Sequence, residues 1–312
     1  MLRCPLYYLL RRREEEASGR RYLDVVFWSG PTPDREFSEF WRRQIPLLPE
    51  FLHRILWKPL HVIAWYWQRS DIMSKHVVDL AFGKNHASAS MNSSGYHAAS
   101  FVEHRDELKL QSCLERLGVA PNSRIALIHV RNSSHDIQTG MKDGYDVNFV
   151  NASPENFQAA VNHLIAEGFS VLTVGNHATS PSGLEGVTEY HKSALRTPML
   201  DFLIGKRAGL FLGTTAGALS GVAFHFRLPS LLTNHLIWNS EITAEPFSYG
   251  RAIFLLKGVT RDGSQLSHGE VMSSRLPSSD RALRELGISL QENSGADILA
   301  GVKELQIGRA HV

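Results

Sequence analysis

The sequence predicts an α/β fold, with a parallel sheet in the second part of the chain and a shorter N-terminal α/β domain before it. Three observations predict this fold. Apolar runs of strand length recur from residue 125 onward, segments of helical length separate them, and glycine or proline marks many of their ends. Parallel strands need crossovers of this kind, so the alternation indicates a βαβ arrangement.

The N-terminal third contains few regular elements. Residues 22–28 predict a strand, and residues 35–45 predict a helix. Residues 47–67 are rich in Leu, Trp and His, and we expect a helix of the domain that breaks at Pro59. Charged residues interrupt this stretch too often for a membrane span, but a peripheral helix on anionic lipid is an alternative. Residues 83–100 are small and polar, which is typical of a loop or linker.

The second domain is predicted to alternate helices and buried strands, and is Rossmann-like in this respect. Its helices are expected at residues 105–118, 153–168, 198–208 and 215–226, and its strands at 125–130, 169–175, 209–213 and 229–234. Ser153 is the expected N-cap of the second helix. The predicted domains are residues 1–115 and 116–300.

Composition excludes several classes of protein. The 312 residues include 43% hydrophobic and 21% charged residues, enough apolar side chains to bury a core. The formal net charge of +2 gives no reason to expect nucleic acid as a partner. Cys4 and Cys113 are the two cysteines, so the chain has no disulfide framework, and it lacks the HExxH and GxSxG motifs. We therefore expect no metal site, and the two cysteines fit a reducing cytoplasm.

The turn GTTAG follows the predicted strand 209–213 and precedes a predicted helix. Gly213, Thr214 and Thr215 would present hydroxyl and backbone N–H groups where a helix begins, which favours phosphate binding. The alternative is a packing turn that binds nothing.

Arg131 lies just past the end of the first strand of the second domain, and His129 is on the same face of that strand. Ligands of open α/β sheets bind at this edge, where a guanidinium can contact two oxygens of a diphosphate. A surface ion pair for Arg131 and a core role for His129 are the alternatives. Arg131 and the GTTAG turn are predicted at one edge of one sheet, and this favours an anion site.

Four further polar residues are candidates for contact with a nucleoside or sugar. They follow other strands or lie in the loop before a helix: Asn176, Tyr190, Ser193 and Asn234. Each has an ordinary loop role as its alternative.

The second domain resembles a family of bacterial glycosyltransferases associated with surface polysaccharide synthesis. The resemblance runs in order through residues 125–134, 155–176, 187–234 and 254–272, within a span of roughly residues 120–275, about half of the chain. More distantly, HVR followed by a Gly-Thr-Thr turn is similar to the donor half of fucosyltransferase-like GT-B enzymes. The resemblance implies a GT-B-like donor domain preceded by a short or incomplete acceptor-side domain.

The resemblance also implies a reaction. A sugar would pass from a nucleoside diphosphate sugar to a cell-surface glycan or a lipid-linked glycan, without a metal or a separate cofactor, in the cytoplasm and with the inner face of the membrane as a possible peripheral contact. Arg131 and the turn of Gly213, Thr214 and Thr215 would hold the diphosphate. By position, His129, His135 and Asp136 are candidates for the base, and the donor's base and sugar stay open.

Two other functions remain as alternatives: a nucleotide-sugar-binding fragment without catalysis, and a GT-B-fold epimerase. The first draws on the C-terminal residues 306–312, QIGRAHV, which read like a translated sequencing adapter. On that interpretation these residues are a non-native tail, and we expect a closing C-terminal helix to be missing.

Overall fold

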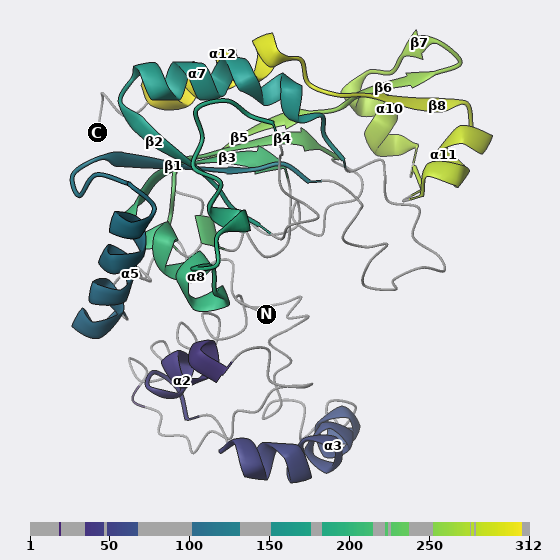
Figure 1. Ribbon diagram of the computed structural model, residues 1–312. Helices are drawn as coiled ribbons and strands as arrows, with labels where there is room; N and C mark the ends of the chain where they lie inside the picture. Colours follow the sequence, from purple (N-terminus) through teal and green to yellow (C-terminus); the bar gives the residue numbers. More distant parts are fainter. Residues whose placement is uncertain are drawn as a thin grey trace. The chain divides into compact units, whose positions relative to one another are not determined.

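Figure 1 shows the chain as a computed structural model. The structure describes Gly19 and residues 35–46, 49–67, 102–131, 151–175, 183–214, 222–223, 226–236, 252–274, 276–277 and 279–307. It divides into two compact units, Met1–Phe101 and Val102–Val312. The predicted domain boundary, between residues 115 and 116, falls at the C-terminal end of helix α5 (His104–Arg116), which belongs to the second unit.

The described part of the first unit consists of two helices, α2 (Arg35–Arg42) and α3 (Glu50–Trp67). The predicted helix at residues 35–45 is therefore present as α2, and its aromatic rings Phe40 and Trp41 pack edge to face with centroids 5.0 Å apart. The predicted strand at residues 22–28 and the linker at residues 83–100 lie outside the described residues.

Helix α3 continues through Pro59, so the predicted break at this proline is wrong. Pro59 is exposed, and water can therefore bond the backbone carbonyl that a proline leaves without a partner. Large apolar side chains of α3 are also exposed: Phe51, Ile55, Val62, Ile63, Trp65 and Tyr66.

The second unit is built on a five-stranded parallel sheet with the order β2-β1-β3-β4-β5. Its strands are β1 (Arg124–His129), β2 (Phe169–Thr173), β3 (Ala208–Thr214), β4 (Ser230–His235) and β5 (Ala252–Leu256). The prediction of an α/β fold with a parallel sheet is confirmed. The sequence predicted four of these strands and missed β5, whose residues are less buried than those of its neighbours.

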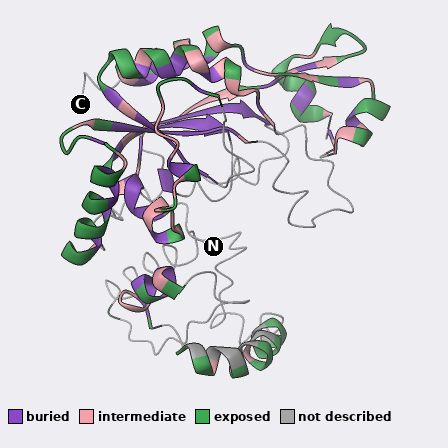
Figure 2. Cartoon of the chain, in the orientation of Figure 1, coloured by how far each residue is buried: buried purple, intermediate pink, exposed green. Residues whose placement is uncertain are grey.

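Helices cover both faces of this sheet (Figure 1). Helices α7 (Gln158–Ala166) and α12 (Gly295–Ile307) lie on one face, and α5 and α8 (Pro198–Arg207) lie on the other. Figure 2 shows the strands as the most buried elements and the outer helix surfaces as exposed. The core beneath α7 and α12 includes Ala126, Ile128, Val161, Leu164, Leu210, Leu212, Ile298 and Val302.

The helix ends follow the sequence signals in part. Thr197 caps α8 by accepting a hydrogen bond from the Leu200 N–H over 3.1 Å, and a proline is in the first turn. The predicted helix at Ser153 starts instead as a 3₁₀ turn, η4 (Pro154–Phe157), and the Ser153 side chain makes no capping hydrogen bond. The predicted helix at residues 215–226 lies largely outside the described residues.

The C-terminal part adds elements that the sequence did not predict. Strands β6 (Gly258–Arg261), β7 (Ser264–Gln265) and β8 (Ile288–Gln291) form an antiparallel sheet, accompanied by α10 (His268–Ser273) and α11 (Asp280–Glu285).

The described residues end in helix α12, which includes residues 306 and 307 of the expected non-native tail. Helix α12 packs on the sheet beside α7, and the two helices are linked by a 2.8 Å hydrogen bond between His163 Nε2 and Gln306 Oε1. Residues 308–312 lie outside the described residues.

The packing of α8 gives a stability prediction. A Cβ atom on Gly205 would meet Val222 Cγ1 and would lie 2.7 Å from Phe226 Cδ2. We expect Gly205→Ala to lower the free energy of unfolding by about 1–3 kcal/mol, because both neighbours are buried. Urea unfolding measures the change. Gly269→Ala is the matched control, because no atom lies within 4 Å of its Cβ, and equal effects of the two variants would contradict the predicted packing.

Candidate functional site

The carboxyl ends of all five strands meet at one edge of the sheet, because the strands are parallel. From β1 the chain passes to β2 on one side of it, and then returns to β3 on the other side. The strand order therefore reverses between β1 and β3. Open α/β sheets bind their ligands outside the carboxyl ends of the strands at such a reversal. Arg131 and Thr214 lie at this position.

The backbone of Arg131 is held on both sides. Its N–H donates to Thr214 Oγ1 over 3.0 Å, and its carbonyl accepts from the Ala152 N–H over 3.1 Å. Thr214 is buried, whereas Arg131 is partly exposed. The predicted neighbours Arg131 and Thr214 are therefore in contact. This contact fixes the Arg131 backbone at the point where the strand order reverses.

His129 is the last residue of β1 and is 2% exposed. Burial lowers the pKa of its imidazole to about 3, the positive charge of Arg131 adds to this shift, and a hydrogen bond to the Thr214 backbone opposes it. Its Nδ1 atom is buried and finds no hydrogen-bond partner in the structure described. A neutral imidazole with this pKa is a poor general base near pH 7, but it can form a hydrogen bond to a ligand.

Gly213 is paired in register with His129. A Cβ atom at this position would meet the His129 carbonyl oxygen and would lie 3.1 Å from His129 Cβ. Close approach of β1 and β3 therefore requires this glycine, independently of any phosphate. Thr214 likewise holds Arg131 through its hydroxyl group, and Thr215 lies outside the described residues.

Two more buried polar atoms lie at the end of β4. Thr233, which is paired in register with Thr214, has a buried hydroxyl, and Asn234 has a buried side-chain amide nitrogen; neither has a hydrogen-bond partner within the described structure. The carbonyl oxygen of the same Asn234 side chain accepts from the Asn293 N–H over 2.9 Å. That bond fixes the orientation of the amide, so the atom without a partner is the NH₂ donor.

Asn234 also has a structural role that the sequence did not suggest. Its backbone is in the left-handed region, with φ 53°, and its N–H donates to Asn293 Oδ1 over 2.6 Å. Asparagine is among the residues that tolerate this conformation. The predicted ligand contact at Asn234 therefore rests on its amide nitrogen alone.

Tyr190 and Ser193 are placed in a different environment from the loop that the sequence suggested. Tyr190 is fully buried in η5 (Tyr190–Lys192), and burial followed by the nearby Asp201 carboxylate raises its pKa. Ser193 accepts a hydrogen bond from the Leu195 N–H over 3.1 Å. Both residues have structural explanations.

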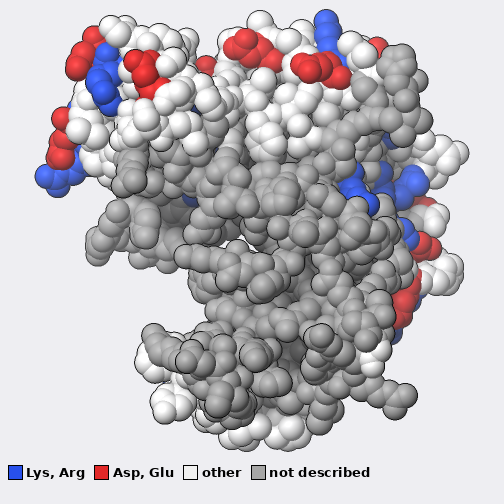
Figure 3. Space-filling model, turned by 180° about the vertical axis from the view of Figure 1, so that it is seen from behind, with Lys and Arg blue, Asp and Glu red and all other residues white. Residues whose placement is uncertain are grey.

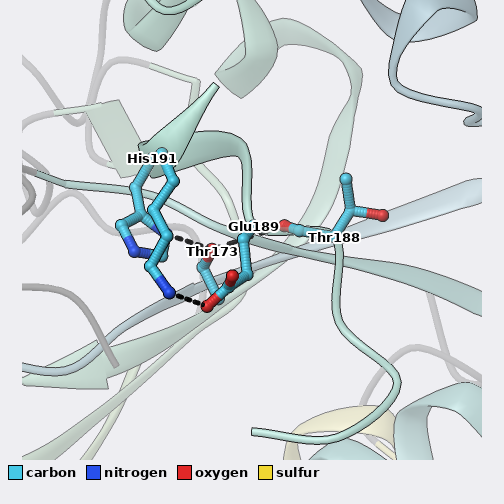
Figure 4. A network of polar contacts seen from close by, with 5 residues as sticks. Thr173, Thr188, Glu189 and His191 are labelled. Atoms are coloured by element: carbon cyan, nitrogen blue, oxygen red, sulfur yellow. Dashed lines mark hydrogen bonds and ion pairs between the residues drawn. The ribbon is translucent and has the colours of Figure 1, made fainter. Parts of the chain in front are cut away.

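The η5 turn is fastened to the end of β2, as Figure 4 shows. Thr173 Oγ1 lies 2.5 Å from His191 Nδ1 and 3.3 Å from the Thr188 carbonyl oxygen. Beside it, Lys192 and Glu189 form an ion pair of 2.5 Å.

Burial also raises the pKa of Asp201, while Arg196 opposes this through hydrogen bonds of 3.2 and 2.7 Å to the two carboxylate oxygens. This pair braces the start of α8 next to Tyr190. The predicted site residues Asn176 and Asp136 lie outside the described residues, as does His135.

Lys257 lies at this edge and was not predicted from the sequence. It follows β5, is 7% exposed, and donates from Nζ to the Asn151 carbonyl oxygen over 2.8 Å. Burial lowers its pKa, and the carboxylates of Glu292 and Asp280 oppose this. A lysine directly after the apolar run AIFLL was the available signal, but recognising it required β5 to be identified as a strand.

The surface in Figure 3 carries Lys and Arg next to Asp and Glu on the part of the face that is described. Anion binding at the sheet edge must therefore come from the groups there. The described residues contain no group of three or more His, Cys, Asp or Glu side chains placed to hold a metal ion. Among the same residues, no helix combines the length and the apolar character needed to cross a bilayer.

Comparisons of the chain with protein-family models, with curated proteins and with solved structures found no match.

The shifted pKa of His129 predicts a pH dependence of stability. Its folded-state pKa of about 3 lies below the ordinary value of 6.5, so at intermediate pH the unfolded chain binds a proton that the folded chain does not. Stability therefore falls as the pH drops below 6.5, by roughly 2 kcal/mol at about pH 5.

Urea unfolding of the wild type and of His129→Leu at about pH 7.5 and about pH 5 measures this effect. We expect the wild type to lose more stability than the variant. Equal losses would contradict a neutral, buried His129.

Proposed function

We propose that the chain is a glycosyltransferase of the GT-B type, which binds a nucleoside diphosphate sugar at the carboxyl edge of its five-stranded sheet. Transfer would be to a glycan or lipid-linked glycan. One observation carries the proposal: around the reversal of strand order next to Arg131, three buried polar atoms lack a described hydrogen-bond partner, on His129, Thr233 and Asn234. Such atoms are rare in proteins and mark places where a ligand or water completes the bonding.

Arg131 supplies the charge that this chemistry requires. A guanidinium can bond two phosphate oxygens at once and stabilise the negative charge that develops on a departing diphosphate. Thr214 and Ala152 hold the arginine backbone, so the point from which the guanidinium side chain extends is fixed before the ligand arrives. Such preorganisation is what makes electrostatic stabilisation effective.

His129 contributes a hydrogen bond in this proposal and is not the base. Its neutral imidazole can bond a ligand oxygen without adding a second positive charge beside Arg131. Asp136 and His135 remain the sequence-based candidates for the base that deprotonates the acceptor hydroxyl.

Binding without transfer is the second candidate function. All the residues that support the site belong to the second unit, so a module with this unit alone would bind the nucleotide sugar. Release of nucleoside diphosphate in the presence of a glycan acceptor distinguishes a transferase from such a module.

Nucleotide binding is the first prediction of this proposal. We expect one of UDP, GDP or CDP, or a sugar derivative of one of them, to raise the melting temperature in EDTA. The stabilisation reaches about 2.7 kcal/mol when the ligand is at about 100 times its Kd. Arg131→Ala should abolish this stabilisation.

The matched control is Arg281→Ala, which removes an exposed arginine paired with Glu285 on α11. It should keep the full ligand response. A wild type that melts cooperatively but responds to no nucleotide, or an Arg131→Ala variant that responds fully, would contradict the proposal.

A further inference from the structure

The carboxyl ends of β4 and β5 form a second polar cluster beyond Arg131. The Lys257 N–H donates to the His235 carbonyl over 3.1 Å, and Asn293 Nδ2 donates to the Leu256 carbonyl over 2.8 Å. Since Asn293 also pairs with Asn234, these bonds hold the ends of both strands together. Asn234, Lys257 and Asn293 are each more than nine-tenths buried.

Lys257 is connected to the Arg131 site through one peptide group. Its Nζ atom is 2.8 Å from the Asn151 carbonyl oxygen, and the next N–H, that of Ala152, is 3.1 Å from the Arg131 carbonyl oxygen. With standard peptide bond lengths, Lys257 Nζ lies within about 8.5 Å of that oxygen. Lys257 and the Arg131 backbone therefore lie on the two sides of one peptide group, that between Asn151 and Ala152.

The groups available at this cluster are hydrogen-bond donors. Asn234 offers its NH₂ group, and the Lys257 ammonium has three N–H bonds, of which Asn151 accepts one. Thr233 adds a hydroxyl that can donate. The neighbouring carboxylate of Glu292 is engaged elsewhere, because its Oε2 accepts from the Ser153 N–H over 2.8 Å and from Asn156 Nδ2 over 3.3 Å.

Hydrogen-bond donors next to the buried Lys257 ammonium are suited to binding an anion. An ammonium removed from water is stabilised by a negative partner, and charge-assisted hydrogen bonds to phosphate or carboxylate are the strong ones. Burial lowers the pKa of Lys257, and the carboxylates of Glu292 and Asp280 oppose this shift only in part. No ion pair of Lys257 is found in the structure described.

We propose that Thr233, Asn234 and Lys257 form a second anion subsite, so that the ligand of this edge carries a second anionic group in addition to the one at Arg131. The inference rests on the proposed function for the identity of the ligand. The anionic group is either the second phosphate of the diphosphate or a carboxylate on the donor sugar, as in a uronic acid.

The test compares Lys257→Met with Lys303→Met, which removes an exposed lysine from α12 of the same unit. Kd is measured by calorimetry for inorganic pyrophosphate and for nucleoside monophosphates, diphosphates and diphosphate uronates. We expect Lys257→Met to weaken the probes that fill both subsites by about tenfold or more, and Lys303→Met to leave them unchanged. Lys257→Arg should restore most of the affinity.

The probes separate the two sources of the anion. Loss already seen with pyrophosphate and the diphosphates identifies the second phosphate. Loss seen only with the uronates identifies the sugar carboxylate. Equal affinities of Lys257→Met and Lys303→Met for every probe would overturn the subsite.

Thr233→Val provides a second variant that does not depend on charge. The Thr233 hydroxyl is fully buried without a described partner, so a valine of similar shape should fold at least as stably while binding the anion more weakly. Lower stability with unchanged binding would assign the hydroxyl a structural role and contradict the subsite.

Failure of this inference is distinguishable from failure of the proposed function. Nucleotide binding that depends on Arg131 but not on Lys257 would remove only the subsite. Pyrophosphate binding that depends on Lys257, without binding of any nucleotide, would keep the subsite and overturn the proposed function.

Discussion

The close approach of β1 and β3 is the constraint on which the rest of the site depends. Gly213 allows it, because a side chain there would collide with His129, and the Arg131 N–H completes it with a 3.0 Å hydrogen bond to Thr214. These contacts fix where the two central strands separate. They therefore fix the backbone of Arg131 and bury His129 beside β3, whose Thr214 is paired with Thr233 of β4.

The buried polar atoms without partners at this edge do not stabilise the fold. A buried polar atom without a partner costs about 1–3 kcal/mol, and three such atoms lie at the carboxyl ends of β1 and β4. Other buried polar side chains of the unit are bonded, as the Asp201 carboxylate is by Arg196. Unsatisfied groups at the carboxyl edge of a parallel sheet are typical of a site whose bonding is completed by a ligand.

The sequence predicted the central strands because their burial is nearly complete, and a nearly continuous apolar run records this directly. It also predicted Arg131, Thr214 and Asn234 at one edge, since parallel strands bring their carboxyl ends together. It missed β5 and Lys257, because β5 is only partly buried. The sequence around Tyr190 predicted a loop, and only the fold shows that this side chain is buried close to Asp201 of α8.

A crystal structure with the nucleotide that stabilises the protein most is the measurement that tests the central claim most directly. We expect the diphosphate to lie at the carboxyl ends of β1 and β3, within hydrogen-bond distance of Arg131. We also expect the buried polar atoms of His129, Thr233 and Asn234 to gain partners. A nucleotide bound at another place, with this edge unchanged, would contradict the account.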